Sequence, residues 1–110
     1  MSEKILQINV KFSISRAELE TAWLEFAQPI SEAAGLRWKV WLMNEAEHEA
    51  GGIYLFESEA AAQSYVDGPF VAAMKSSPVL SNLSAKLFDV MESHTLITRG
   101  PLRSAVDVAD

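Results

Sequence analysis

The sequence has 110 residues, 49% of them hydrophobic, and a formal net charge of −6, a composition typical of one folded domain. The absence of cysteine excludes disulfides, thiolate nucleophiles and zinc–thiolate sites. The negative charge disfavours nucleic acid and anionic lipid as partners, and no apolar run approaches the ~18 residues that can span a membrane. We therefore expect a cytoplasmic protein with neither nucleic acid nor membrane as a partner.

The N-terminal third predicts a strand followed by a helix. Residues 4–12 alternate between apolar and polar side chains, which is typical of a strand with one apolar face. Ser15 and Glu18 have the spacing of a capping box, which marks the start of a helix. Apolar residues then recur at helical spacing as far as Ala34, and Gly35 is expected to end the helix.

The middle of the chain, from Gly35 to Phe56, predicts an antiparallel hairpin. Residues 36–43 alternate and residues 52–56 are aromatic and β-branched, with a charged, turn-like segment at 44–50 between them. One face is predicted to carry Leu36, Trp38, Val40 and Leu42, and the other Arg37, Lys39, Trp41 and Met43. Because both faces carry large apolar side chains, both must be covered.

The last third predicts a second helix and a final strand. Ser58 can cap a helix that stops at Gly68-Pro69 and resumes over residues 70–75. Pro78 and Asn82 bracket a predicted loop, and residues 83–91 alternate as a strand. Residues 95–98 are predicted as a short extended piece. We expect one domain over residues 1–98 and a loose tail over 99–110.

This order predicts an α+β fold of the ferredoxin-like β-α-β-β-α-β type, with a four-stranded antiparallel sheet. Two helices can cover only one face of such a sheet, and the chain is too short to supply a second layer. An apolar sheet face left open on one chain usually marks an interface or a ligand site. We therefore predict a homodimer formed through this face.

The string GLRWKVWLMNEAEHEAGGIYLF at residues 35–56, with AKLFDV at 85–90, resembles the YdhR-like family of mono-oxygenases. That family is similar to the antibiotic-biosynthesis mono-oxygenases, so the resemblance implies a ferredoxin-like domain that dimerises into an α/β barrel. It also implies oxygenation of a small aromatic or polycyclic phenolic compound without metal or flavin, the deprotonated substrate reacting with O₂. Two alternatives keep the fold: a non-catalytic module that binds a small hydrophobic ligand or only dimerises, and an isomerase.

Two residues of the hairpin are candidates for catalysis. His48 carries an imidazole, a side-chain type that can take a proton from a phenol, although it also fits a solvated residue at the tip of an acidic turn. The hydroxyl of Tyr54 can donate to a developing oxyanion.

Further residues are candidates for the wall of a ligand pocket, although each also fits simple core packing or an exposed position. They are Gln7, Asn9, Trp38, Trp41, Gly51, Gly52 and Phe88. Trp38 and Trp41 have opposite parity and can share one pocket only if a bulge intervenes, which the glycine pair could supply. The acidic turn around His48 has no metal-site spacing, and no nucleotide or flavin motif is present, so we expect neither metal nor cofactor.

Overall fold

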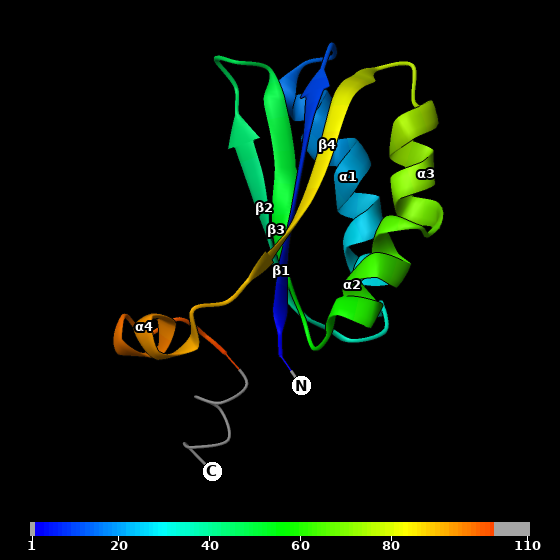
Figure 1. The fold of residues 1–110 in the computed structure, drawn as a ribbon. Coiled ribbons are helices and arrows are strands. Elements are labelled where there is room, and N and C mark those ends of the chain that lie inside the picture. The colour runs from blue at the N-terminus through cyan, green and yellow to red at the C-terminus, as the bar shows by residue number, and fades with distance from the viewer. Residues whose placement is uncertain (1, 103–110) are drawn as a thin grey trace.

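The computed structural model describes residues 2–102. One antiparallel sheet has the strand order β2-β3-β1-β4, with β1 at Lys4–Phe12, β2 at Leu36–Asn44, β3 at Glu49–Phe56 and β4 at Leu80–Asp89. Three helices cover one face, namely α1 (Arg16–Ser31), α2 (Glu59–Val66) and α3 (Pro69–Ser76), while α4 (Glu92–Ile97) lies on the other side of the sheet (Figure 1). The predicted ferredoxin-like α+β order is confirmed, with the second helix divided into α2 and α3.

The helices begin where the capping residues predict. The Ser15 hydroxyl accepts a hydrogen bond from the Glu18 amide at 3.1 Å, and the Glu18 carboxylate accepts one from the Ser15 amide at 3.0 Å. Ser58 caps α2 by accepting from the Ala61 amide, and Pro69 begins α3 at a position that needs no amide donor. Local sequence therefore fixes the start of each covering helix.

The hydrophobic core lies between the sheet and these helices. The alternation of β1 turns four side chains toward the helices, all at most 5% exposed: Leu6, Ile8, Val10 and Phe12. Tyr54 and Phe56 of β3 join the same core and are 1% and 0% exposed. The covered face of the sheet is therefore the one that the alternating pattern of β1 predicts.

Four local predictions need correction. Helix α1 ends at Ser31 with Glu32 as its C-cap, so Gly35, with a φ of 79°, lies in the turn before β2 and does not end the helix. The β2–β3 register shifts between Leu36 and Trp38, so Leu36 packs in the core instead of sharing a face with Trp38. Asn82 lies within β4, with a φ of 54°, near the register shift in its pairing with β1, instead of closing a loop. Residues 95–98, predicted as extended, belong to α4 and its C-cap, where the Thr95 hydroxyl donates to the Met91 carbonyl at 2.7 Å.

The chain after α4 returns to the sheet. The indole of Trp38 donates to the Pro101 carbonyl at 2.8 Å, and Leu102 is 2% exposed. Four residues of the predicted tail, 99–102, are thus described, and the remainder of that tail lies outside the described residues. Within residues 2–102, no helix is both long enough and apolar enough to cross a membrane.

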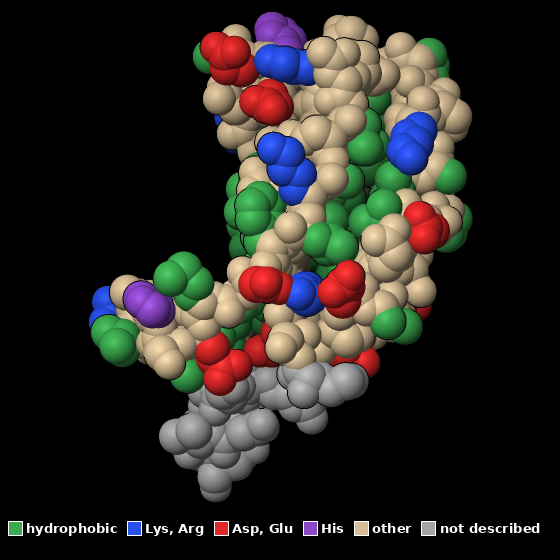
Figure 2. Space-filling view, in the orientation of Figure 1, with side chains coloured by type: hydrophobic (Ala, Val, Ile, Leu, Met, Phe, Trp, Pro, Cys, Tyr) green, Lys and Arg blue, Asp and Glu red, His purple; other side chains and the backbone are tan. Residues whose placement is uncertain are grey.

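The face of the sheet opposite α1–α3, here called the open face, keeps apolar side chains exposed. Val40 is 52% exposed and Phe88 is 47% exposed. Met91, which follows β4, and Ile97 of α4 are 64% and 79% exposed. In Figure 2, apolar side chains reach the surface on α4 and on the adjoining side of the sheet. No helix of residues 2–102 packs over the strands here as α1–α3 do on the other face (Figure 1).

Candidate functional site

A cavity of about 210 Å³ lies between the sheet and helices α1–α3. Most of its wall is apolar, and aromatic rings from both layers form much of it: Trp23, Phe26, Trp41, Tyr54, Tyr65 and Phe70. Among the lining residues that the structure describes, Lys39 is the one charged side chain. The size and lining suit a small flat molecule with few polar groups.

The rings of the cavity wall contact one another across the two layers. Trp23 of α1 lies 5.9 Å from Trp41 of β2 between ring centroids, and Tyr54 of β3 lies 4.9 Å from Tyr65 of α2. Phe26 and Trp41 are nevertheless 43% and 38% exposed, so the cavity reaches the surface between α1 and the edge strand β2. A ligand can therefore reach the rings without unfolding the core.

The two tyrosines supply hydroxyl groups at the inner wall. The Tyr65 and Tyr54 hydroxyl groups share a hydrogen bond of 3.3 Å. Burial raises the pKa of both phenols, because the charged phenolate would lose its hydration. Both tyrosines are thus neutral hydrogen-bond donors at physiological pH, and neither serves as a base.

Lys39 extends from β2 into this aromatic wall. Its Nζ lies 3.3 Å from the ring centroid of Trp41 and 4.4 Å from that of Tyr54. Within residues 2–102, no carboxylate forms an ion pair with it. Burial lowers the pKa of the amine from 10.5 to about 7, since a buried ammonium loses hydration.

The two rings oppose this lowering in part. Each ring face attracts the ammonium by about 0.5–2 kcal/mol, in the direction that raises the pKa. Burial has the larger effect, so the pKa of Lys39 stays below the usual range of lysine.

Gly52 makes room for the lysine side chain. A Cβ at position 52 would lie 2.5 Å from Cε of Lys39 and 3.4 Å from the Tyr54 ring. Gly51 meets a different need, because a Cβ there would lie 1.9 Å from the Ile8 carbonyl oxygen of the neighbouring strand. The β2–β3 pairing continues regularly through both glycines, so the bulge considered for this pair is absent.

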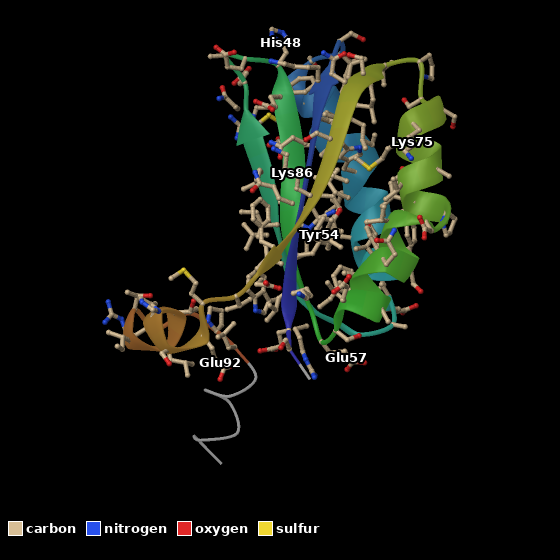
Figure 3. All side chains as sticks on the ribbon, in the orientation of Figure 1. His48, Tyr54, Glu57, Lys75, Lys86 and Glu92 are labelled. Atoms are coloured by element: carbon tan, nitrogen blue, oxygen red, sulfur yellow. The ribbon has the colours of Figure 1, made fainter. Side chains whose placement is uncertain are left out.

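The sequence candidates fall on different parts of the molecule. Tyr54, Trp41 and Gly51 line the cavity, and Gly52 lies under the Lys39 side chain. His48 is exposed at the β2–β3 turn with a φ of 52°, its ring 5.5 Å from that of Phe12, and does not line the cavity. Figure 3 shows His48 at the upper end of the sheet and Tyr54 near its middle.

The other candidates lie on the open face. Gln7 donates to the Asn9 side chain at 3.1 Å, and Asn9 donates to Glu49 at 3.4 Å. Trp38 and Phe88 share this face with them, because their strand partners Leu55 and Ile5 point away from the helices. The register therefore separates Trp38 from Trp41, and these four residues do not reach the cavity.

Sequence reasoning missed Lys39 as a site residue, although a signal was present. Its alternation with Trp41 and Met43 was read correctly, and a glycine pair lies opposite on the predicted hairpin. A lysine between two tryptophans on a face that is predicted to be covered was the available clue. An isolated lysine on a strand is usually exposed, which is why the clue carried little weight.

Comparison with known proteins adds a family to this geometry. The family model described as "Putative mono-oxygenase ydhR" matches residues 5–101. No curated protein matches the chain.

Solved structures share the fold at low sequence identity. A protein of unknown function from Nitrosomonas europaea has a TM-score of 0.66 and 18% identity, covering 83% of this chain and 91% of that chain. SnoaB, a cofactor-independent oxygenase from Streptomyces nogalater, has a TM-score of 0.65 and 15% identity, covering 84% and 96%. The haem degrader MhuD from Mycobacterium tuberculosis has a TM-score of 0.61 and 24% identity, covering 79% and 95%.

At these identities the solved structures establish the fold and not the reaction. The family match extends from β1 to beyond α4 and includes every residue that lines the cavity. The chain therefore belongs to the ydhR family of putative mono-oxygenases.

Proposed function

We propose that this protein is a mono-oxygenase that oxidises a small aromatic or polycyclic phenol in the cavity between the sheet and α1–α3, without bound metal or flavin. The observation that carries the proposal is an aromatic cavity that contains a single amine, Lys39. Rings stack favourably on a flat aromatic ligand and exclude water from it. The fold shared with SnoaB, a cofactor-independent oxygenase, supports the same reaction class.

The cavity suits a substrate that reacts as an anion. A phenolate is electron-rich enough to give electrons to O₂, and its charge needs stabilisation in an apolar site. The Tyr54 hydroxyl, which retains its proton, is a donor for that oxyanion, and the Lys39 ammonium supplies an opposite charge on the same wall. The protein contributes orientation, a dry site and charge stabilisation.

The reaction balances without an external reductant. A ring carbon that bears two hydrogens in the keto form of the phenol is converted to a carbonyl. One atom of O₂ enters the product, and the other leaves as water with those two hydrogens. The substrate supplies all four electrons, so neither flavin nor metal is required.

The sequence names His48 as the proton acceptor, and this stays a prediction. Its imidazole is a suitable base, but it lies at the exposed turn and outside the cavity lining. If His48 is the base, His48→Ala should fold normally and lose about 10²–10⁴-fold in turnover. Unchanged turnover in that variant removes His48 from the mechanism.

We also propose that two copies associate through the open face. Val40 and Phe88 are exposed there, and burial of such side chains favours association. Sedimentation equilibrium at micromolar concentration should then give twice 12.1 kDa. A well-folded monomer under those conditions would contradict the proposed dimer.

Oxygen uptake tests the reaction against its alternatives. A panel of hydroquinones and polycyclic phenols should include a compound whose oxygen consumption exceeds the buffer rate in proportion to protein. Binding without uptake would support the ligand-binding module, and conversion without uptake would support the isomerase. A haem-degrading activity like that named for MhuD would instead require haem to bind with a Soret band and to be consumed.

A further inference from the structure

We propose that Lys39 is the proton acceptor of the cavity, and that it takes the hydroxyl proton of a bound phenol to leave an ammonium–phenolate pair. This inference rests on the phenolic substrate class proposed above, and it assigns the base to a side chain inside the cavity. In this step the phenol O–H bond breaks, its electron pair stays on oxygen, and the Nζ lone pair forms the new N–H bond. No oxidant takes part in it.

The position of the amine is the first support. A general base must lie within hydrogen-bond reach of the proton it takes, and Nζ lies on the cavity wall beside the Trp41 and Tyr54 rings. Because Nζ covers one face of the Trp41 ring at 3.3 Å, a phenol that approaches this part of the wall would meet the nitrogen with its hydroxyl edge instead of stacking on that ring face. The exposed imidazole of His48, by contrast, is outside the lining.

The surroundings of Lys39 are the second support. The other titratable groups lining the cavity are the phenols of Tyr54 on β3 and Tyr65 on α2, and burial keeps both neutral. Helices α1 and α3 contribute no charged side chain to the lining. Arg37, on the same strand, pairs with Glu3 at 3.8 Å and Glu57 at 3.5 Å.

These surroundings make the neutral amine available near physiological pH. With a pKa of about 7, an appreciable fraction of Lys39 has no proton and can accept one. Once protonated, the ammonium faces a phenolate instead of an empty apolar cavity. The ligand therefore supplies the counter-charge that residues 2–102 do not.

Gly52 has a positioning role in this account. Because a Cβ at residue 52 would lie 2.5 Å from Cε of Lys39, Gly52→Ala must displace the end of the lysine side chain. The amine remains present but moves away from its place over the Trp41 ring. This variant changes the geometry of the base without changing its chemistry.

The first experiment measures proton transfer without oxygen. 4-Nitrophenol, whose phenolate absorbs visible light, is titrated anaerobically into wild type, Lys39→Met, Lys39→Arg, Gly52→Ala and His48→Ala. Wild type and His48→Ala should bind the probe as phenolate below the pH at which the free probe ionises. In Lys39→Met the bound phenolate fraction should fall at least tenfold, and in Gly52→Ala it should fall by less.

Lys39→Arg separates proton acceptance from charge alone. The guanidinium is already protonated, so a neutral phenol that this variant binds as phenolate must release its proton to the buffer, whereas in wild type the neutral amine keeps that proton. Circular dichroism checks that each variant is folded. Unchanged ionisation in Lys39→Met, or its loss in His48→Ala alone, would overturn the assignment to Lys39.

The second experiment needs no ligand. The chain has five lysines, so ¹³C NMR of the lysine Cε atoms can follow each amine, with Lys39→Met assigning one signal. One lysine should titrate near pH 7 and be absent from the Lys39→Met spectrum. If Lys39 titrates with the other four lysines, it is protonated at neutral pH and the proposal is wrong.

The two proposals can fail separately. Ionisation of the phenol by Lys39 without any oxygen uptake would contradict the mono-oxygenase and leave the base intact. Oxygen uptake that is equal in wild type and Lys39→Met would contradict the base and leave the oxygenase intact. If wild type binds neither 4-nitrophenol nor the two-ring 2-naphthol, the phenolic ligand class is wrong.

Discussion

The two faces of the sheet are built from the same four strands but carry different side chains, and helices α1–α3 cover only one of them. The covered face meets α1–α3 and encloses a cavity lined by rings and one amine. The open face leaves Val40 and Phe88 exposed beside a hydrogen-bonded polar row of Gln7, Asn9 and Glu49. One chain can thus complete a site on one face while leaving the other face for association.

The difference shows that apolar content alone does not identify a site. Trp38 and Trp41 are three residues apart, yet Trp38 bonds the returning chain at Pro101 while Trp41 lines the cavity. What distinguishes the covered face is a titratable group held in apolar surroundings, which is the usual mark of a functional site. Variants of matched residues on the two faces test this distinction.

The largest expected effect is on catalysis. Lys39→Met should lower the oxygen-uptake turnover by about 10²–10⁴-fold, because the variant removes the base but keeps the volume of the side chain. Gln7→Leu, a matched change of a polar residue on the open face, should change turnover by less than about threefold if the dimer persists. Equal losses in both variants would remove the distinction between the faces.

The next effect is on stability. Phe56→Ala should destabilise the protein by about 3–5 kcal/mol, because the fully buried ring leaves a void in the core. Phe88→Ala on the open face should change the unfolding free energy of the monomer far less, since Phe88 is 47% exposed. Urea unfolding at low protein concentration compares the two variants.

Much of this architecture could be predicted from the sequence because its signals are local. The Ser15 capping box, the alternation of β1 and the break at Gly68-Pro69 each involve neighbouring residues only. The predictions that were wrong concern features that depend on strand pairing and on the surrounding tertiary structure. The register shift that turns Leu36 inward depends on β3, and residues 95–98, three of them β-branched, belong to α4 and its C-cap against their local preference.

The site was harder to predict for the same reason. Tyr54 and Trp41 were named, but the cavity forms only when α1 and α3 pack over them. The altered proton affinity of Lys39 arises from burial, which alternation suggests but does not measure. Sequence reasoning therefore named two rings of the cavity wall and missed the lysine beside them.

A third prediction concerns the pH dependence of stability. The pKa of Lys39 is lowered to about 7 in the folded protein from 10.5, so between these values the unfolded chain binds more protons. The free energy of unfolding of wild type should therefore rise with pH through this window, relative to Lys39→Met, by on the order of 2 kcal/mol. The urea midpoints of wild type and Lys39→Met at pH 6.5 and 9.5 measure the difference. If both midpoints change equally with pH, folding does not lower the pKa of Lys39.

The smallest expected effect concerns association. Val40→Asp on the open face should weaken the proposed dimer about tenfold or more, because an unpaired carboxylate would be buried in the proposed interface. Leu24→Asp is the control, since Leu24 lies on α1 with 75% exposure, away from that face. Sedimentation equilibrium should show dissociation for Val40→Asp only, and the reverse result would move the interface to the helices.

The central claim is that this chain inserts one oxygen atom from O₂ into a phenolic substrate held in the cavity. The most direct test is mass spectrometry of the product that forms from an active phenol under ¹⁸O₂, with wild type and Lys39→Met compared. We expect a wild-type product that carries one ¹⁸O atom, and far less of that product from the variant. A product without ¹⁸O, formed equally by both proteins, would contradict it.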